Sequence, residues 1–143
     1  MVDNGGAGVN YDMFQAGALA LPQKYLRNLS AMRHYISKAN EIRYRGLISQ
    51  RGTALGDAML QGRDPVWAGG VPIASADMLG SNEAGVLNQG FFTYPKNLIF
   101  GIQRTIQVET DKDIRAREII IVLTCRAALQ IDEVAATVKY INI

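Results

Sequence analysis

The sequence contains little of what most catalytic sites need. Its 143 residues include one cysteine, Cys125, and one histidine, His34. A single cysteine cannot form an internal disulfide, and these two residues cannot supply the four ligands of a structural zinc site. A serine or cysteine triad would have to use His34, and no serine or acid is tied to it by spacing. We therefore expect no enzyme, no cofactor and no metal site, and a structural role for His34.

Nucleotide-binding loops and acidic metal sites are also missing. The 14 glycines form neither a GxGxxG fingerprint nor a Gly-Lys-Ser/Thr loop. Glu109, Asp111 and Asp113 could suggest a metal ion, but the basic residues among positions 112–117 favour a solvated, salt-bridged helix start. Cys125 falls on an apolar face, so we expect it to behave as a small hydrophobic residue with little thiolate character.

Long hydrophobic runs are absent as well. No apolar segment approaches the roughly 20 residues of a membrane-spanning helix. Met1 is not followed by the basic and then apolar segments of a signal peptide. The chain is long enough to bury a core without disulfides or metals. We expect one globular unit with no membrane partner, in the cytosol or in a particle.

Basic residues are concentrated in one segment. Residues 24–51 hold seven basic side chains and one acid, whereas the whole chain has a net charge of only +2. The basic residues are Lys24, Arg27, Arg33, Lys38, Arg43, Arg45 and Arg51. With Tyr25, Tyr35 and Tyr44 interleaved, the segment has the composition of a nucleic-acid footprint. A solvated helix face, or a face complementary to an acidic neighbouring subunit, fits equally well.

The first half of the chain mixes helical and strand patterns. Residues 1–11 are rich in glycine and lack apolar periodicity, so we expect a flexible lead-in. Apolar spacing predicts a short helix over 12–21 and a further turn after it. A strand over 32–36 precedes a helix that Ser37 caps and that runs to about Arg51. Its buried stripe is predicted to be Tyr44, Leu47 and Ile48.

Three shorter features follow. A helix over 53–60 begins at Thr53. A strand over 71–74 contains Pro72, which indicates the edge of a sheet. Residues 77–90 have little pattern and are expected to form a loop.

The last third has the strongest pattern in the chain. Residues 119–131 place apolar side chains at every second position, which predicts one strand of about 40 Å. An earlier strand pattern, around 102–109, is expected to end where residues 111–115 become polar. After a turn, residues 134–140 predict a returning strand with one apolar face. Long antiparallel strands after a mixed segment indicate an α+β fold.

Several motifs occur in the order and spacing of one known family. They are Leu21-Pro22-Gln23-Lys24-Tyr25, Leu47-Ile48-Ser49-Gln50-Arg51, Leu55-Gly56-Asp57, Gly70-Val71-Pro72-Ile73 and Tyr94-Pro95-Lys96-Asn97-Leu98-Ile99-Phe100-Gly101. With the long strand up to Asp132, this arrangement resembles the C-terminal part of tailed-phage major capsid proteins of the Hong Kong 97 fold. The resemblance covers roughly residues 12–143.

The resemblance implies a shell-building subunit with a truncated Hong Kong 97-like α+β fold. Residues 12–104 would be similar to the axial domain and residues 105–143 to the β-strands of the peripheral domain, after the lead-in 1–11. The chain would self-assemble into pentamers and hexamers of a phage or prophage icosahedral capsid that encloses DNA, with a scaffold protein as a further partner. It would reside in the virion, and in the host cytoplasm during assembly.

The charge asymmetry suggests where subunits meet. The acids Glu109, Asp111 and Asp113 are candidates for contact with Arg43, Arg45 or Arg51 of a neighbouring subunit, closing a ring of repeated interfaces. Other functions stay open. One is a nucleic-acid-binding module that uses residues 24–51. Another is an encapsulin-like shell protein or a fragment that interferes with capsid assembly.

Overall fold

The chain divides into two compact units in the computed structural model, which describes residues 1–6, 8–76, 79 and 89–143. The first, here called the sheet unit, comprises Met1–Asn97 and Glu133–Ile143. The second, here called the hairpin, comprises Leu98–Asp132. The predicted boundary between residues 104 and 105 therefore falls inside a strand of the hairpin. The C-terminal strand belongs to the sheet unit because its partners in pairing lie there.

The sheet unit mixes helices and short strands, as predicted. Its strands are β1 (Val2–Asp3), β2 (Arg33–Ile36), β3 (Val66–Trp67), β4 (Val71–Ser75), β5 (Gly90–Thr93) and β8 (Thr137–Ile141). Its helices are α1 (Tyr11–Leu19), α2 (Lys38–Ser49) and α3 (Ala54–Leu60), with 3-10 turns η1 (Gln23–Ala31), η2 (Ala68–Gly70), η3 (Pro95–Asn97) and η4 (Val134–Ala136). Within the part of the chain that is described, no helix is long and apolar enough to cross a bilayer.

The six strands form one sheet in the order β1-β8-β5-β2-β4-β3. The β1–β8 and β2–β4 pairs are parallel and the other pairs antiparallel. The edge position predicted for Pro72 is wrong, because β3 pairs with β4 on its outer side. That pairing does not need an amide from proline, since the Ile73 amide donates to the Pro65 carbonyl at 3.0 Å.

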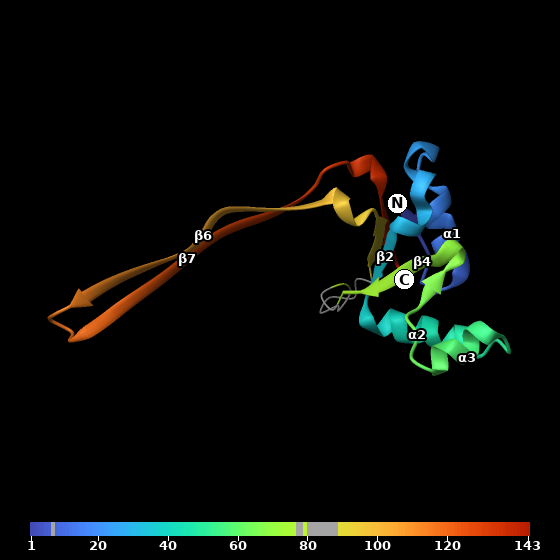
Figure 1. The fold of residues 1–143 in the computed structure, drawn as a ribbon, viewed down its shortest axis with the longest axis horizontal. Coiled ribbons are helices and arrows are strands. Elements are labelled where there is room, and N and C mark those ends of the chain that lie inside the picture. Colours follow the sequence, from blue (N-terminus) through green and yellow to red (C-terminus); the bar gives the residue numbers. More distant parts are fainter. Residues whose placement is uncertain (7, 77–78, 80–88) are drawn as a thin grey trace. The chain divides into compact units, whose positions relative to one another are not determined.

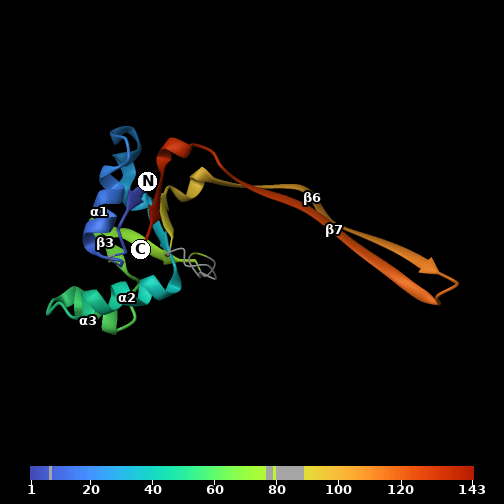
Figure 2. The same ribbon diagram turned by 180° about the vertical axis from the view of Figure 1, so that it is seen from behind.

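The helices begin where the sequence predicts them. The Asn10 side chain accepts a hydrogen bond from the Met13 amide at 2.8 Å and caps α1. Ser37 Oγ accepts one from the Asn40 amide at 3.3 Å and caps α2. Both views show α2 and α3 side by side (Figures 1 and 2).

One part of the predicted helical stripe is wrong. Tyr44 and Ile48 of α2 are buried, but Leu47 is 47% exposed. Buried positions 40, 41, 44 and 48 follow spacings of three and four residues, and Leu47 lies beside that row rather than on it.

The N-terminal segment, for which the sequence predicts a flexible lead-in over 1–11, contributes a short strand to the sheet. β1 adds to the sheet as a parallel neighbour of β8, with Val2 opposite Tyr140. The Gly6 amide donates to the Asn142 carbonyl at 2.8 Å. Gly5 and Gly6 have φ angles of 58° and 78°, so here glycine serves a left-handed turn. A two-residue strand is too short to give a periodic signal.

The core lies between the sheet and its helices. Fully buried aromatic and aliphatic side chains come from α1 (Phe14), β2 (Ile36), β4 (Val71), β5 (Phe92) and β8 (Tyr140). Elements far apart in sequence thus share one apolar cluster.

A buried polar cluster joins the two chain segments of the sheet unit that flank the hairpin. The Asn97 side-chain amide donates to Glu133 O at 2.9 Å, Thr137 Oγ1 at 3.1 Å and Thr93 Oγ1 at 3.2 Å. Asn97 Oδ1 accepts from the Glu133 amide at 2.7 Å. Thr93 Oγ1 also lies 3.2 Å from the Ala136 carbonyl. We call this the Asn97 clamp; it holds the segment before residue 98 to the segment after residue 132.

The hairpin consists of two long antiparallel strands, β6 (Leu98–Asp113) and β7 (Glu118–Ile131). They form a twisted two-stranded ribbon (Figure 2). The long strand over 119–131 is confirmed, but its partner is β6 and not the returning segment, which forms η4 and β8. β6 also continues through Asp111 to Asp113, contrary to prediction. Polar residues do not end a strand whose side chains are solvated.

The predicted loop over 77–90 lies largely outside the described residues. Its last residue, Gly90, begins β5. The Cβ of any other residue at this position would lie 2.7 Å from the Tyr35 carbonyl, so β5 and β2 approach each other closely here.

Candidate interaction surfaces

The chemistry-bearing side chains of the described residues do not gather into a catalytic or metal site. No group of three His, Cys, Asp or Glu side chains in the described ranges could hold a metal ion. His34 is fully buried and stacks on Phe92 with ring centroids 4.1 Å apart. Its Nδ1 lies 2.9 Å from the Tyr140 hydroxyl. Burial lowers the pKa of His34 to about 3, so the ring is neutral and has a structural role at neutral pH.

Cys125 does not lie where the sequence predicted. It is exposed on β7, although the strand pattern indicated a buried apolar face. The thiol donates a weak hydrogen bond to the Arg104 carbonyl at 3.5 Å. A shallow hollow of about 640 Å³ adjoins it, lined by residues 101–103 and 125–128 of the two strands. The alternation of apolar residues correctly predicts a face but does not tell whether anything covers that face.

A buried carboxylate organises the basic face of α2. The Glu41 carboxylate accepts hydrogen bonds from Lys38 Nζ at 2.7 Å and from Arg45 Nε at 2.8 Å. Burial opposes its charged form, but hydrogen bonds from Lys38, Arg45 and Ser75 outweigh this and lower the pKa of Glu41 to about 2. Arg45 also donates to the Arg63 carbonyl at 2.7 Å. This cluster lines a polar cleft of about 330 Å³.

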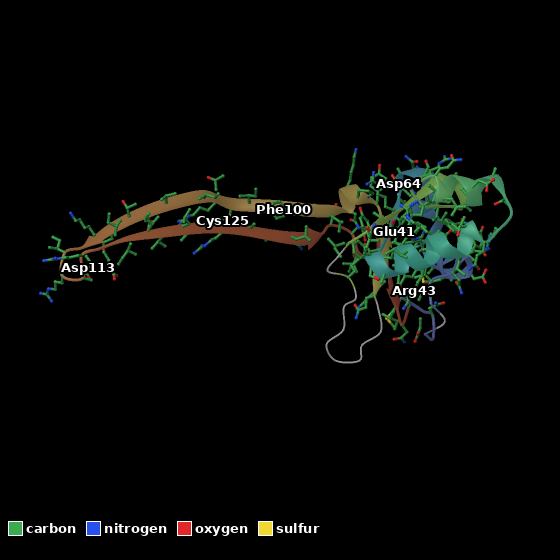
Figure 3. All side chains as sticks on the ribbon, turned by 90° about the horizontal axis from the view of Figure 1, so that it is seen from below. Glu41, Arg43, Asp64, Phe100, Asp113 and Cys125 are labelled. Carbon is green, nitrogen blue, oxygen red and sulfur yellow. The ribbon has the colours of Figure 1, made fainter. Side chains whose placement is uncertain are left out.

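The predicted arginines differ in burial and in the contacts that their side chains already make. Arg45 is half-buried and already bonded by Glu41, and it lies 3.7 Å from Asp64. Arg43 is exposed and donates to Asn40 Oδ1 at 3.5 Å. Arg51 is exposed after the end of α2. Figure 3 labels Glu41, Arg43 and Asp64 in this region.

The predicted acids lie together near the turn of the hairpin, and all are exposed. Glu109, Asp111 and Asp113 follow one another along β6, not along a helix as the salt-bridged interpretation assumed. Asp113 Oδ1 accepts from the amides of Arg115 and Ala116 at 2.8 and 3.1 Å, which closes the turn. Asp113 marks this end of the ribbon in Figure 3.

The tyrosines of the basic segment are not free to stack on bases. Tyr44 is buried and bonds the Val66 carbonyl at 3.4 Å. Tyr35 stacks on Phe91 with centroids 4.6 Å apart. Lys24 Nζ lies 4.5 Å from the centroid of the Tyr25 ring. The tyrosines that contributed to the nucleic-acid interpretation therefore already contact other residues of the chain.

An exposed apolar surface lies on one face of the hairpin. Cross-strand pairing sets Phe100 opposite Leu129 and Val108 opposite Leu123. The apolar residues of this face, here called the apolar face, are Leu98, Phe100, Ile102, Val108, Ile119, Ile121, Leu123, Cys125, Ala127, Leu129 and Ile131. Thr110 and Lys112 lie on the same face near the turn, opposite Ile121 and Ile119. Leu123 is 65% exposed and Leu129 68% exposed. The sequence pattern predicted the β7 half of this face and, around 102–109, part of the β6 half; two register shifts in β6 interrupt the rest of its alternation.

Comparisons with known proteins find a relative named as a prophage protein and a similar fold in a phage chain. No protein-family model matches the sequence. The chain is 36% identical over 149 residues to the "Putative prophage capsid protein YqbE" of Bacillus subtilis (strain 168), a match that covers 100% of this chain and 48% of that protein. This chain thus spans about half the length of the curated relative it matches.

A solved structure shares the fold. A chain from Mycobacterium phage Che8 superposes with a TM-score of 0.68 at 13% sequence identity. The superposition covers 99% of this chain and 53% of the phage chain. The fold described above is therefore also found in about half of a phage protein.

Proposed function

We propose that this chain is a structural, non-enzymatic subunit of a phage or prophage capsid. The observation that carries the proposal is the 36% identity, over the whole of this chain, to a protein named as a prophage capsid protein. The similarity in fold to a chain from a mycobacterial phage, at 13% sequence identity, supports the proposal. In this role the chain would reside in the virion and have other copies of itself as main partners.

The exposed hairpin supports a role in assembly. A two-stranded ribbon is marginally stable by itself in water. Its apolar face, two strands wide and some 13 residues long, covers about 400 Å² in projection. An area of this size lies within the range of the largest apolar patch on a typical monomer, and such a patch is often functional. Burial of this face in an assembly would stabilise both the ribbon and the contact.

The finer assignment rests on the resemblance to capsid proteins of the Hong Kong 97 fold. We propose that the sheet unit corresponds to the axial domain and the hairpin to strands of the peripheral domain. Pentamers and hexamers that enclose DNA, a scaffold partner and a cytoplasmic assembly stage belong to the same proposal. Arg43 and Arg51, with exposed guanidinium groups, stay candidates for contact with the acids Glu109, Asp111 and Asp113 of a neighbour. Arg45 is the weakest candidate because Glu41 already binds it.

Light scattering across a concentration series, with electron microscopy of the same sample, tests the proposal. We expect weak association of the isolated chain that grows with concentration. Leu123→Ser with Leu129→Ser should reduce it, because both changes make the apolar face polar. Leu19→Ser with Leu60→Ser is a matched control, since these leucines are 76% and 74% exposed in the sheet unit. A chain that stays monomeric at every concentration would contradict self-assembly.

A nucleic-acid-binding function makes a different prediction. It requires DNA affinity that falls steeply with salt and no formation of rings. An encapsulin-like shell would form particles without DNA, and an interfering fragment would reduce the yield of an infecting phage. The same sample, measured with and without DNA, separates these outcomes.

A further inference from the structure

Two arginines face each other across the hairpin. Continuing the register of the pair Leu98–Ile131 would set Arg104 opposite Cys125. A register shift after Ile102 instead sets Arg104 opposite Arg126. Directly opposed side chains have Cβ atoms about 5 Å apart, and like charges in this position are destabilising. Both arginines are exposed, and no ion pair within the described ranges involves either one.

The acids near the turn lie on the same face of the ribbon as these arginines. Glu118 and Arg126 are eight positions apart on β7, and because this number is even, their side chains share a face. Asp113 is opposite Glu118, and Glu109 is opposite Val122. The face, here called the charged face, carries acids at the turn end and arginines in the middle; its charged members are Arg104, Glu109, Asp111, Asp113, Glu118 and Arg126. Ile99, Ile120 and Val122 lie on the same face. It lies opposite the apolar face.

This distribution of charge is self-complementary. Ile120, the partner of Asp111, is six residues from Arg126, which is about 20 Å along the strand. Two hairpins can stack with their charged faces together and their strands antiparallel. If the two-fold axis passes midway between Asp111 and Arg126, the acids of each hairpin lie over the arginines of the other. Two-fold symmetry makes the two contacts identical. Each guanidinium can bind a carboxylate with two parallel hydrogen bonds.

We propose that the charged face is a contact between two copies of this chain, in which the acids of each hairpin bind Arg104 and Arg126 of the other. The proposal rests on the proposed function, since it specifies one contact of the assembly. It assigns the acids a different partner from Arg43 and Arg51. The opposed arginines carry the argument: a neighbour's carboxylates would remove a repulsion that the chain alone does not relieve.

Charge swapping tests the contact. We expect Arg104→Glu with Arg126→Glu, and separately Asp111→Lys with Asp113→Lys, each to weaken self-association at low salt by roughly tenfold or more. An equimolar mixture of the two variants should regain it, because both contacts of the mixed dimer then pair opposite charges. The chain with all four changes should regain it alone. Sedimentation equilibrium at low and high salt gives the association constants.

Controls keep the proposal falsifiable. Arg104→Gln with Arg126→Gln should fold, because it removes a repulsion, and should lose part of the association. Arg63→Glu with Lys139→Glu, which reverses two exposed charges of the sheet unit that are assigned to no contact between subunits, should leave association unchanged. Association that ignores the swaps at Arg104 and Arg126, or a mixture that does not recover, overturns this contact and leaves the capsid proposal intact. A wild-type chain that never associates overturns both.

Discussion

His34 should make the stability of the sheet unit depend on pH, and between about pH 6.5 and pH 5 this dependence lies above the range in which most carboxylates titrate. The ring is fully buried among Phe14, Phe92 and Tyr140. Burial lowers its pKa from 6.5 to about 3, so the unfolded chain takes up a proton at a higher pH than the folded chain. Stability is therefore full above pH 6.5 and is lost as the pH falls, down to about pH 3.

The size of the effect follows from the shift. Each unit of pKa corresponds to about 1.4 kcal/mol, so the whole window represents about 5 kcal/mol. At pH 5, before most carboxylates titrate, the free energy of unfolding should be about 2 kcal/mol lower than at pH 7.5. Urea unfolding at a series of pH values, followed by circular dichroism, measures this directly.

The variant His34→Phe is the control for this prediction. Phenylalanine keeps an aromatic ring next to Phe92 but cannot bind a proton or pair with the Tyr140 hydroxyl. It should be less stable than wild type at pH 7.5, yet its stability should not change between pH 7.5 and pH 5. Because His34 is the only histidine in the chain, no second histidine can mask the result. A wild-type protein with equal stability at pH 7.5 and pH 5 would refute the reasoning.

Three further changes have defined expectations, all measured by chemical denaturation. Gly17→Ala should destabilise by about 1–3 kcal/mol, because the new Cβ would overlap the Tyr140 side chain, whereas Gly46→Ala, with open space around it, should stabilise by up to about 1 kcal/mol. Asn97→Ala should cost about 3 kcal/mol, since it removes the hydrogen bonds that Asn97 makes to the Glu133 amide and carbonyl; a cost near zero would show that water replaces them. Glu41→Gln should cost about 1–3 kcal/mol at pH 7, and the wild type should lose this contribution as the pH falls below 4.5 towards about 2; equal stability of the two at pH 7 would contradict it.

Local sequence signals predicted local structure well. Ser37, predicted to cap a helix, accepts a hydrogen bond from the Asn40 amide at the start of α2, as a side-chain oxygen that satisfies a free amide should. The alternation over 119–131 predicted β7, because a period of two is the direct signature of a strand. Each of these features depends on residues within a few positions of one another.

What failed depends on residues far apart. The pairing of Val2 with Tyr140 joins the two ends of the chain, and no local pattern encodes it. The exposure of Leu123 and Leu129 depends on what covers β7, which alternation does not specify. Arg104 lies opposite Arg126 only because a register shift after Ile102 changes its partner from Cys125 to Arg126.

Because the Asn97 clamp closes the base of the hairpin, the lengths of the two hairpin strands can vary without change to the sheet unit. The clamp ties Asn97 to Glu133, so the sheet unit is closed whatever length of ribbon joins them. Removing or adding one residue on each strand would change the reach by about 3.3 Å and would turn every side chain beyond that point to the opposite face. Two residues on each strand, about 6.6 Å, is therefore the smallest step that keeps both faces aligned. We expect related chains to differ in hairpin length by such steps while their sheets stay alike.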